Sequence, residues 1–436
     1  MLFRKYHIYL FLLIFLMFSS VRAEASPPPF PPGTFDVTMP NVSGIRTDLL
    51  KHIAPIIQQS IAEGKYPGAI VLAAHRGHII YRGIFGSRRI LPDVAPMNFN
   101  TIFDVASLTK VVATTPAIMQ LVEQGKLDLD APVEKYWPEF AAHGKEAVTV
   151  RDLLTHSSGL PADLASPAHG EAEILRQIAQ LKLSHPAGTH YLYSDINFIV
   201  LAYLVEHLSQ ESFVQYTQNH IFKLLKMDDT SFLPAPQLRD RIAPTEMINH
   251  ELRWGVVHDP MAHAMGGISG NAGLFSTAAN LGVYAQCLLD NGRLPVAAPR
   301  NKKPRYLLGP LTVLKMTTPQ TLPMLAEIRG LGWDIDSPYS NRGVLFPVQS
   351  FGHTGWTGTS LWIDPVTQTW IVVLTSRTHP TAAGNNQIVQ DRRAIANIIA
   401  ASLTDIPTIN QHNTGHGELI RAYPQIEIAA TTRDRG

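Results

Sequence analysis

The chain has 436 residues, of which 45% are hydrophobic and 16% charged, and this balance excludes a wholly disordered protein. The 36 basic and 35 acidic residues leave a formal charge of +1 without any long run of like charges, so no nucleic acid is expected as a partner. The sequence has no fixed-period repeat, which argues against a solenoid or a propeller.

The first 23 residues have the pattern of a secretory signal peptide. Arg4 and Lys5 precede an apolar stretch over residues 8–17, and small residues follow up to Ala23, where we expect cleavage. The apolar stretch is shorter than the ~20 residues that cross a bilayer as a helix, so a retained anchor is the weaker alternative. The sequence therefore predicts a periplasmic or secreted protein with no stable membrane span after signal cleavage.

Two segments outside the expected domain are predicted to contain no helix or strand. Residues 24–44 are expected to form a Pro-rich spacer, because residues 26–33 read SPPPFPPG and proline-rich chain is extended. Residues 405–436 lack a clear hydrophobic period and are expected to form a peripheral C-terminal tail.

The remaining chain, residues 45–404, is predicted to form one domain. Strand patterns occur near both of its ends, whereas helical patterns dominate the middle. We therefore predict an α/β (α+β) fold with an antiparallel sheet, built from residues 45–95 and 331–404, that is flanked by helices and interrupted by a mainly helical lobe over about 96–330. The expected elements are a helix over 45–64, a hairpin of strands over 69–74 and 78–82, helices over 171–183, 198–208 and 281–289, strands over 348–352, 360–363 and 369–375, and a helix over 387–403.

The single cysteine, Cys287, excludes an intrachain disulfide. It lies in a segment with the apolar spacing of a buried helix face, which favours a small core residue over a thiol nucleophile. An exported chain without a disulfide must then be stabilised by its core, and this length can supply one.

The first chemical motif is Ser107-Leu108-Thr109-Lys110. It brings a hydroxyl and an amine to one face if a helix begins at the serine, where free N–H groups and the helix dipole favour negative charge. Alone, the pattern of a serine and a lysine three residues apart is expected about once by chance in such a chain. It would then be a helix start with a surface lysine.

Two further motifs follow in order, Tyr193-Ser194-Asp195 and His353-Thr354-Gly355. With all three, the chain resembles the serine β-lactamase and penicillin-binding-protein superfamily, in which S-x-x-K, Y-x-N and K/H-T-G occur in this order. It is most similar to class C β-lactamases, related esterases and D-Ala-D-Ala carboxypeptidases, and among these to the periplasmic proteins called penicillin-binding protein 4B. Segments over 153–161, 255–259 and 265–276 also resemble family stretches, and the resemblance covers about residues 45–403.

The resemblance implies a role for each motif residue. Ser107 would be the nucleophile of acyl transfer, and Lys110 the candidate base, which requires its pKa to fall below the ~10.4 of a free lysine. Tyr193 would share or relay the proton and later protonate the leaving group. Substrate and oxyanion contacts are expected from Thr354, Gly355 and the backbone N–H groups of Ser107 and Trp356.

Two positions depart from the family pattern. Asp195 replaces the usual asparagine, and its carboxylate is expected to hold Lys110 protonated and to shift the role of base toward Tyr193. His353 replaces a lysine that helps to bind the substrate carboxylate in β-lactamases. With an ordinary pKa of ~6.5, it is expected to bind anions weakly and to favour anionic substrates more as the pH falls toward ~6. This replacement favours an esterase or peptidase over an efficient β-lactamase.

Two other clusters have simpler interpretations. His258, Asp259 and His263 contain zinc-ligand types, yet no HExxH-like motif supports them, and the resembled family holds no metal at this stretch, so neither a metal nor a cofactor is expected. His156-Ser157-Ser158 could suggest a second nucleophile, but the following Gly159-Leu160-Pro161 favours a structural turn.

The sequence thus predicts a periplasmic serine hydrolase that works through an acyl-enzyme on Ser107. The expected substrates are D-alanyl cell-wall peptides or small esters, with penicillin binding and weak or no β-lactamase activity. The alternative is a catalytically silent protein of the same fold that binds muropeptides. The sequence does not indicate an oligomeric state.

Overall fold

The computed structural model describes residues 34–295, 303–382 and 386–406. The expected signal peptide, the SPPPFPPG segment and the tail beyond residue 406 lie outside the described residues. Among the described residues, no helix combines the length and the apolar character that a membrane span requires.

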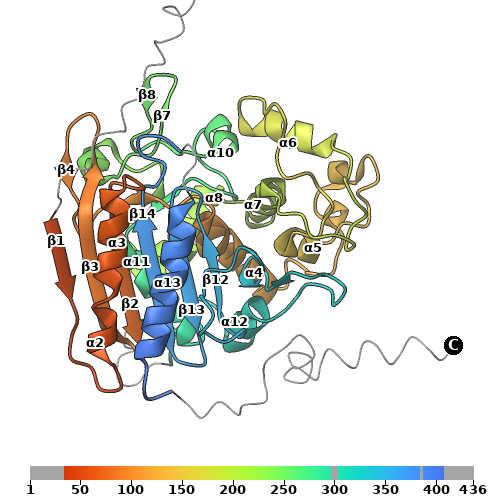
Figure 1. The fold of residues 1–436 in the computed structure, drawn as a ribbon. Coiled ribbons are helices and arrows are strands. Elements are labelled where there is room, and N and C mark those ends of the chain that lie inside the picture. Colours follow the sequence, from red (N-terminus) through yellow and green to blue (C-terminus); the bar gives the residue numbers. More distant parts are fainter. Residues whose placement is uncertain (1–33, 296–302, 383–385, 407–436) are drawn as a thin grey trace, which may run out of the picture.

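A large antiparallel sheet forms the centre of the molecule (Figure 1). Within the described residues it has nine strands in the order β1-β3-β2-β14-β13-β12-β11-β10, with β4 paired to β3 outside this path. The strands are β1 (Thr34–Thr38), β2 (Gly68–His75), β3 (His78–Arg89), β4 (Ala95–Pro96), β10 (Ile328–Arg329), β11 (Asp334–Asp336), β12 (Phe351–Thr354), β13 (Ser360–Asp364) and β14 (Thr369–Thr375). β2 lies beside β14, so the sheet does join both ends of the domain, as predicted.

The two central strands are buried on both faces, which explains their nearly continuous apolar sequences. Alternate residues of β2 pack into different cores, because side chains along a strand point to opposite faces. Val71 lies in a core with helices α2 (Thr47–Leu50), α3 (Ile53–Ala62) and α13 (Gln387–Ser402), whereas Leu72 lies in the larger core shared with the helical lobe. Figure 1 shows α3 and α13 side by side on one face of the sheet.

The inserted lobe is mainly helical, as expected, and packs on the other face of the sheet (Figure 1). Its α-helices are α4 (Thr115–Glu123), α5 (Val150–Thr155), α6 (Glu171–Ala179), α7 (Asp195–Ser209), α8 (Phe213–Thr217), α9 (Lys223–Leu225), α10 (Pro260–Ala264), α11 (Ala278–Leu289) and α12 (Pro310–Thr317). The lobe also contains small sheets of β5 (Phe103–Asp104), β9 (Leu274–Ser276) and β6 (Ser231–Phe232), and of β7 (Met247–Ile248) and β8 (Glu251–Leu252). Strands of two or three residues are too short for a period of two to reveal them.

Three local predictions were wrong. Residues 34–38 were placed in the spacer, but they form the edge strand β1, with Thr34 opposite Gly86 and Thr38 opposite Arg82. The strand expected over 348–352 is β12, Phe351–Thr354, because a turn between Pro347 and Ser350 precedes it. The helix expected over 45–64 is interrupted between α2 and α3.

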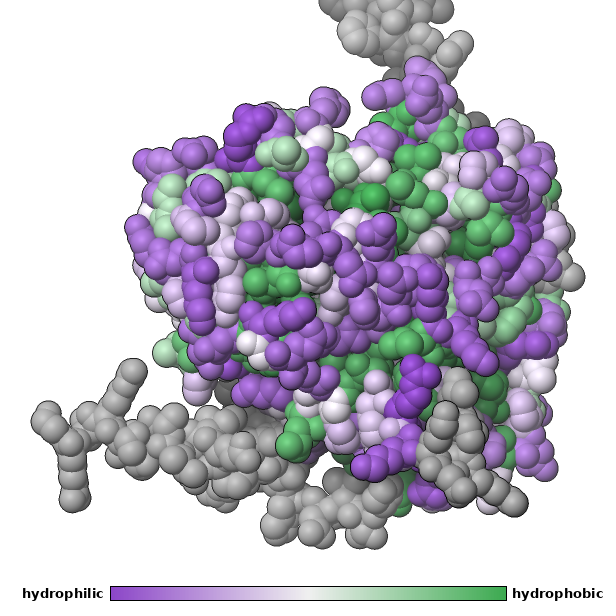
Figure 2. All heavy atoms as spheres, turned by 180° about the vertical axis from the view of Figure 1, so that it is seen from behind, coloured by the Kyte–Doolittle hydropathy of each residue, from purple (hydrophilic) through white to green (hydrophobic). Residues whose placement is uncertain are grey.

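Cys287 packs inside α11 as expected, and burial raises the pKa of its thiol to about 12, which keeps it protonated. Figure 2 shows that the face opposite to that of Figure 1 is largely hydrophilic, with hydrophobic residues in several separate patches.

Candidate active site

The three sequence motifs meet at one cavity of about 740 Å³. Ser107 precedes the π-helical turn Lys110–Thr114, Tyr193 precedes α7, and His353 lies on β12. The residues that line the cavity are Ser107, Tyr193, Arg329, Asp334, Tyr339, His353, Thr354, Gly355, Trp356, Arg377, Asn386, Ile388, Val389, Gln390, Arg392 and Arg393. Ser107 and His353, which lie 246 positions apart in the sequence, therefore belong to one site.

Lys110 forms polar contacts with three other residues of the site. Its side chain is fully buried, and its Nζ donates to Ser107 Oγ at 2.9 Å and to the carbonyl oxygen of Asn271 at 2.9 Å. The same Nζ forms an ion pair with Asp195 Oδ1 at 2.6 Å. Ser107 follows Ala106, whose φ of 47° lies in the left-handed region that a residue with a Cβ rarely adopts. The serine is thus presented by a sharp, strained turn.

The charges around Lys110 differ from those that the base role requires. Burial alone would lower the pKa of Lys110, but the carboxylate of Asp195 and the neighbouring Tyr193 hydroxyl raise it well above its ordinary value. The lysine is therefore an ammonium group at neutral pH. The effect expected of Asp195 is present in the structure, whereas the lowered pKa expected of Lys110 is not.

Tyr193 lies against this ammonium group. Its ring stacks on His156 with 4.4 Å between the ring centres, and Lys110 Nζ lies 5.0 Å from the centre of the Tyr193 ring. Burial raises the pKa of the Tyr193 hydroxyl; the Lys110 ammonium opposes this rise, and the Asp195 carboxylate adds to it. The phenol interacts with both Ser107 and Lys110, and each interaction lowers its pKa. One hydroxyl, one phenol and one ammonium group thus share a single network around the buried Lys110.

His353 has a different state from the one that the sequence suggested. Its Nδ1 lies 2.8 Å from the carbonyl oxygen of Thr354, and its side chain is buried. Burial, followed by the charges of Arg329 and Lys110, holds the pKa of His353 well below its ordinary range. The predicted increase of imidazolium toward pH ~6 is therefore wrong, because the expectation assumed a solvated ring.

The turn after β12 carries the remaining predicted residues. Gly355 N donates to the carbonyl oxygen of Thr359 at 2.7 Å, and Trp356 is 60% exposed at the cavity. The guanidinium of Arg377 lies 4.3 Å from the centre of the Trp356 ring, and its Nε donates to the Trp356 carbonyl oxygen at 2.6 Å. The exposed indole is thus held in place by a neighbouring cation.

Sequence reasoning missed the cationic character of the cavity. Arg329, Arg377, Arg392 and Arg393 line it, whereas Asp334 is the one carboxylate among the described lining residues. Arg329 is 2% exposed; its Nη2 donates to the carbonyl oxygen of Gly332 at 3.0 Å, and its Nε has no partner among the described residues. The only signal in the sequence was an arginine within the otherwise apolar segment 328–333.

The two other clusters have structural roles. His258 Nε2 lies 2.9 Å from Glu246 Oε2, while Asp259 Oδ1 accepts from the backbone N–H of Ala262 at the start of α10. Within the described part of the chain, no group of three His, Cys, Asp or Glu residues is arranged to hold a metal ion. His156 ends α5 in the left-handed conformation, and its Nδ1 accepts from the backbone N–H of Ser194, so this stretch is a structural turn.

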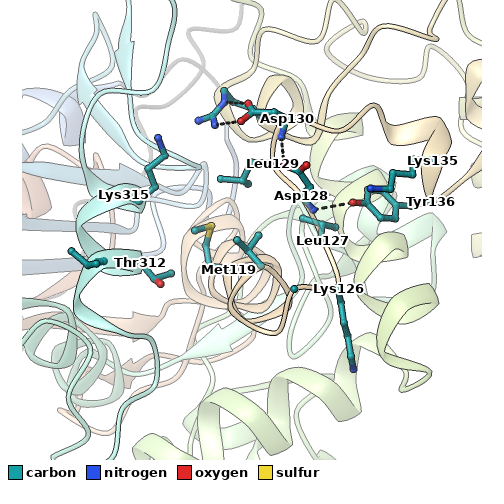
Figure 3. Close-up of a pocket in the computed structure, with 14 residues that line it drawn as sticks. Met119, Lys126, Leu127, Asp128, Leu129, Asp130, Lys135, Tyr136, Thr312 and Lys315 are labelled. Carbon is teal, nitrogen blue, oxygen red and sulfur yellow. Dashed lines mark hydrogen bonds and ion pairs between the residues drawn. The ribbon is translucent and has the colours of Figure 1, made fainter. Parts of the chain in front are cut away.

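A second cavity of about 730 Å³ lies between α4 and α12 and contains none of the predicted site residues (Figure 3). Its acids are occupied by neighbours. Asp130 binds Arg151 through two hydrogen bonds of 2.7 and 3.1 Å, and Asp128 Oδ1 accepts from the backbone N–H of Asp130 at 3.0 Å.

Comparisons with known proteins agree with this geometry. A model of the family described as Beta-lactamase matches residues 53–394. An Escherichia coli protein named "Putative D-alanyl-D-alanine carboxypeptidase" is 29% identical over 414 residues, which cover 85% of this chain and 92% of that protein. The chain therefore belongs to the beta-lactamase family of serine hydrolases, as the motifs predicted.

Solved structures share the fold. A penicillin-binding protein homolog from Caulobacter crescentus is 23% identical, with a TM-score of 0.66 over 84% of this chain and 100% of that chain. A hydrolase described as having promiscuous acyltransferase activity is also 23% identical, with a TM-score of 0.62 over 80% of this chain and 99% of that chain. The predicted fold class, an antiparallel sheet flanked by helices with the β-lactamase/transpeptidase architecture, is thus confirmed.

The replacement Asp195→Asn should destabilise the protein in a pH-dependent way. The raised pKa of Lys110 means that its ion pair stabilises the fold fully below the pKa of an unfolded lysine, ~10.4. Without the carboxylate, burial lowers the pKa of Lys110. We expect the variant to lose about 3 kcal/mol of unfolding free energy at pH 7. This loss should shrink toward pH 10, where the buried lysine can be neutral.

Urea unfolding at both pH values measures this difference. The matched control is Asp130→Asn, which breaks an exposed ion pair with Arg151 and should cost less than about 1 kcal/mol at either pH. An equal loss at pH 7 and pH 10 for Asp195→Asn would contradict the charge state assigned to Lys110.

Proposed function

We propose that this serine hydrolase forms an acyl-enzyme on Ser107 and acts on D-alanyl cell-wall peptides, with small esters as the second substrate class. The observation that carries the proposal is the network in which the buried Lys110 Nζ lies 2.9 Å from Ser107 Oγ and 2.6 Å from Asp195 Oδ1, beside Tyr193. Such a network supplies a nucleophile, a proton acceptor and a fixed positive charge.

Tyr193 is the proposed base. Lys110 is protonated and donates to Ser107 Oγ, so it cannot accept the serine proton in this state. Because burial raises the pKa of Tyr193, only a minor fraction is phenolate at neutral pH, and the adjacent ammonium stabilises that form. In this form the Tyr193 oxygen would take the Ser107 proton while Ser107 Oγ bonds to the substrate carbonyl carbon. Tyr193 would then return the proton to the departing amine or alcohol. Water would release the acyl group by the reverse sequence.

The developing oxyanion requires donors that are already in place. The proposed donors are the backbone N–H groups of Ser107 and Trp356, with Thr354 and Gly355 forming the adjacent substrate wall. Both Ser107 and Trp356 line the same cavity, which supports this assignment.

An anionic substrate suits the cavity better than a neutral one. Four arginine side chains line it against one carboxylate, and the buried Arg329 has an Nε without a partner among the described residues. The free carboxylate of a D-alanyl peptide could neutralise part of this charge. The name of the Escherichia coli relative points to the same substrate class. A periplasmic site of action is proposed from the signal-peptide pattern.

The alternative, a silent muropeptide-binding protein, also has an observation in its favour. The pKa values of Lys110 and Tyr193 are both raised, so neither group is a ready base at neutral pH. This property would slow turnover and predicts weak or no β-lactamase activity in either case.

Labelling with a fluorescent penicillin tests the acyl-enzyme. We expect the label on the peptide that contains Ser107, because the Oγ opens the lactam to form an ester, and we expect no label on Ser107→Ala. The matched control, Ser158→Ala, changes a buried serine of the structural turn and should keep the label. Label on any other residue, or label retained by Ser107→Ala, would contradict the assignment.

Turnover of p-nitrophenyl butyrate, nitrocefin and a D-Ala-D-Ala peptide by the same protein separates the enzyme from the alternative. Hydrolysis of the peptide or the ester supports the proposal. Binding of wall fragments without any turnover would support the silent form.

The positive charge of the cavity should lower the KM of a D-alanyl peptide with a free carboxylate relative to that of its methyl ester. Because His353 is neutral, the KM of a D-alanyl peptide with a free carboxylate should not improve relative to that of its methyl ester between pH 7 and pH 6. Arg329→Met should raise the KM of the free-acid peptide about tenfold and leave that of the methyl ester unchanged. Steady-state kinetics measure both effects.

Arg293→Met, which changes an exposed arginine outside the cavity, is the control for loss of a positive charge. A relative gain for the free acid at pH 6, or equal losses for acid and ester in Arg329→Met, would contradict anion recognition by the arginine wall.

A further inference from the structure

Two buried threonines connect the nucleophile turn to the turn after β12. Thr357 Oγ1 donates to the carbonyl oxygen of Asp104 at 2.7 Å, and Thr359 Oγ1 donates to the carbonyl oxygen of Val105 at 3.0 Å. The threonines are 1% and 0% exposed, so water does not compete for these bonds. The two carbonyl groups belong to the two residues before Ala106, and the two hydroxyls lie one and three positions after Trp356.

The two turns also approach each other closely. A Cβ added to Gly355 would lie 2.4 Å from the carbonyl oxygen of Val105 and 2.2 Å from Thr359 Oγ1, so only glycine fits there. On the nucleophile side, Asp104 Oδ1 accepts from the N–H of Ala106 at 2.9 Å and holds its left-handed backbone.

The threonine side of the contact is fixed to the domain. The backbone N–H of Arg377 donates to the carbonyl oxygen of Thr357 at 2.8 Å, and Arg392 Nη2 donates to that of Thr359 at 2.8 Å. The connection therefore runs from the nucleophile turn, through two hydroxyls, to the end of β14 and to α13.

We propose that Thr357 and Thr359 are positioning residues that set the spacing between the N–H groups of Ser107 and Trp356. This inference rests on the proposed function, in which these two groups bind the oxyanion. The threonines do not touch the substrate. They fix the distance between two turns. A shift of an oxyanion donor by about 1 Å can lower the reaction rate by up to a hundredfold. Their loss should therefore affect the transition state and leave binding of the ground state intact.

Thr357→Val and Thr359→Val keep the side-chain volume and remove the hydroxyl. With p-nitrophenyl butyrate, we expect each variant to lower kcat about tenfold to hundredfold and to leave KM within about twofold. Thr357→Ser and Thr359→Ser retain the donor and should restore kcat to within about threefold. Thr217→Val is the matched control, because it removes a buried threonine bond of 2.8 Å to Phe213 in α8, and it should leave kcat unchanged.

A boronic acid inhibitor gives a readout that a structural role would not change. Ser107 Oγ would add to the boron, lose its proton and form a tetrahedral anion that resembles the transition state. Its affinity should fall in the valine variants by about the same factor as kcat. Unchanged kcat and boronate affinity in both valine variants would overturn the proposal. So would a loss that the serine variants do not restore.

Because each threonine bonds a different carbonyl, either valine variant tests the proposal if the other does not fold. Failure of the proposed function would be seen in a different variant, because Ser107→Ala would then keep its turnover. Failure of the positioning role would be seen only in the threonine variants.

Discussion

The buried ion pair between Lys110 and Asp195 is the interaction on which the site depends. A fully buried ammonium group is costly unless it has partners, and Lys110 finds them on three separate segments. It contacts Ser107 on the nucleophile turn, Asp195 at the start of α7 and the carbonyl oxygen of Asn271 before β9. The charge that orients the serine therefore also joins parts of the lobe that are distant in sequence.

This ion pair also settles how the site divides its chemistry. Asparagine at position 195 would leave burial to lower the pKa of the lysine, whereas the carboxylate keeps the proton on Lys110. The ammonium then acts as a fixed electrostatic partner for Tyr193 and Ser107. At the other side of the cavity, burial holds His353 neutral, so in the proposed function anion recognition falls to the guanidinium groups of the lining arginines. In the proposed function, the two departures from the family motifs have related consequences: the role of base moves from Lys110 to Tyr193, and anion binding moves from His353 to the arginines.

Much of this arrangement could be predicted from the sequence, and the failures have physical reasons. The strand Thr369–Thr375 was predicted with its observed bounds, because a buried central strand is a continuous apolar run flanked by turn residues. The meeting of Ser107, Tyr193 and His353 followed from ordered motifs. The pKa of His353 could not be predicted, since it depends on burial and on Arg329, which lies 24 positions earlier in the chain. The strand β1 was missed because the proline-rich residues before it suggested that the spacer continued.

The protonation state of Lys110 is the most direct test of this account. In protein labelled with ¹⁵N-lysine, the Nζ resonance of Lys110 can be assigned by its absence from Lys110→Arg and followed by NMR from pH 6 to pH 10. The account predicts an ammonium chemical shift that stays constant over this range. A titration with a midpoint below about pH 9, where a free lysine is still charged, would show that Lys110 is the base and would contradict the account.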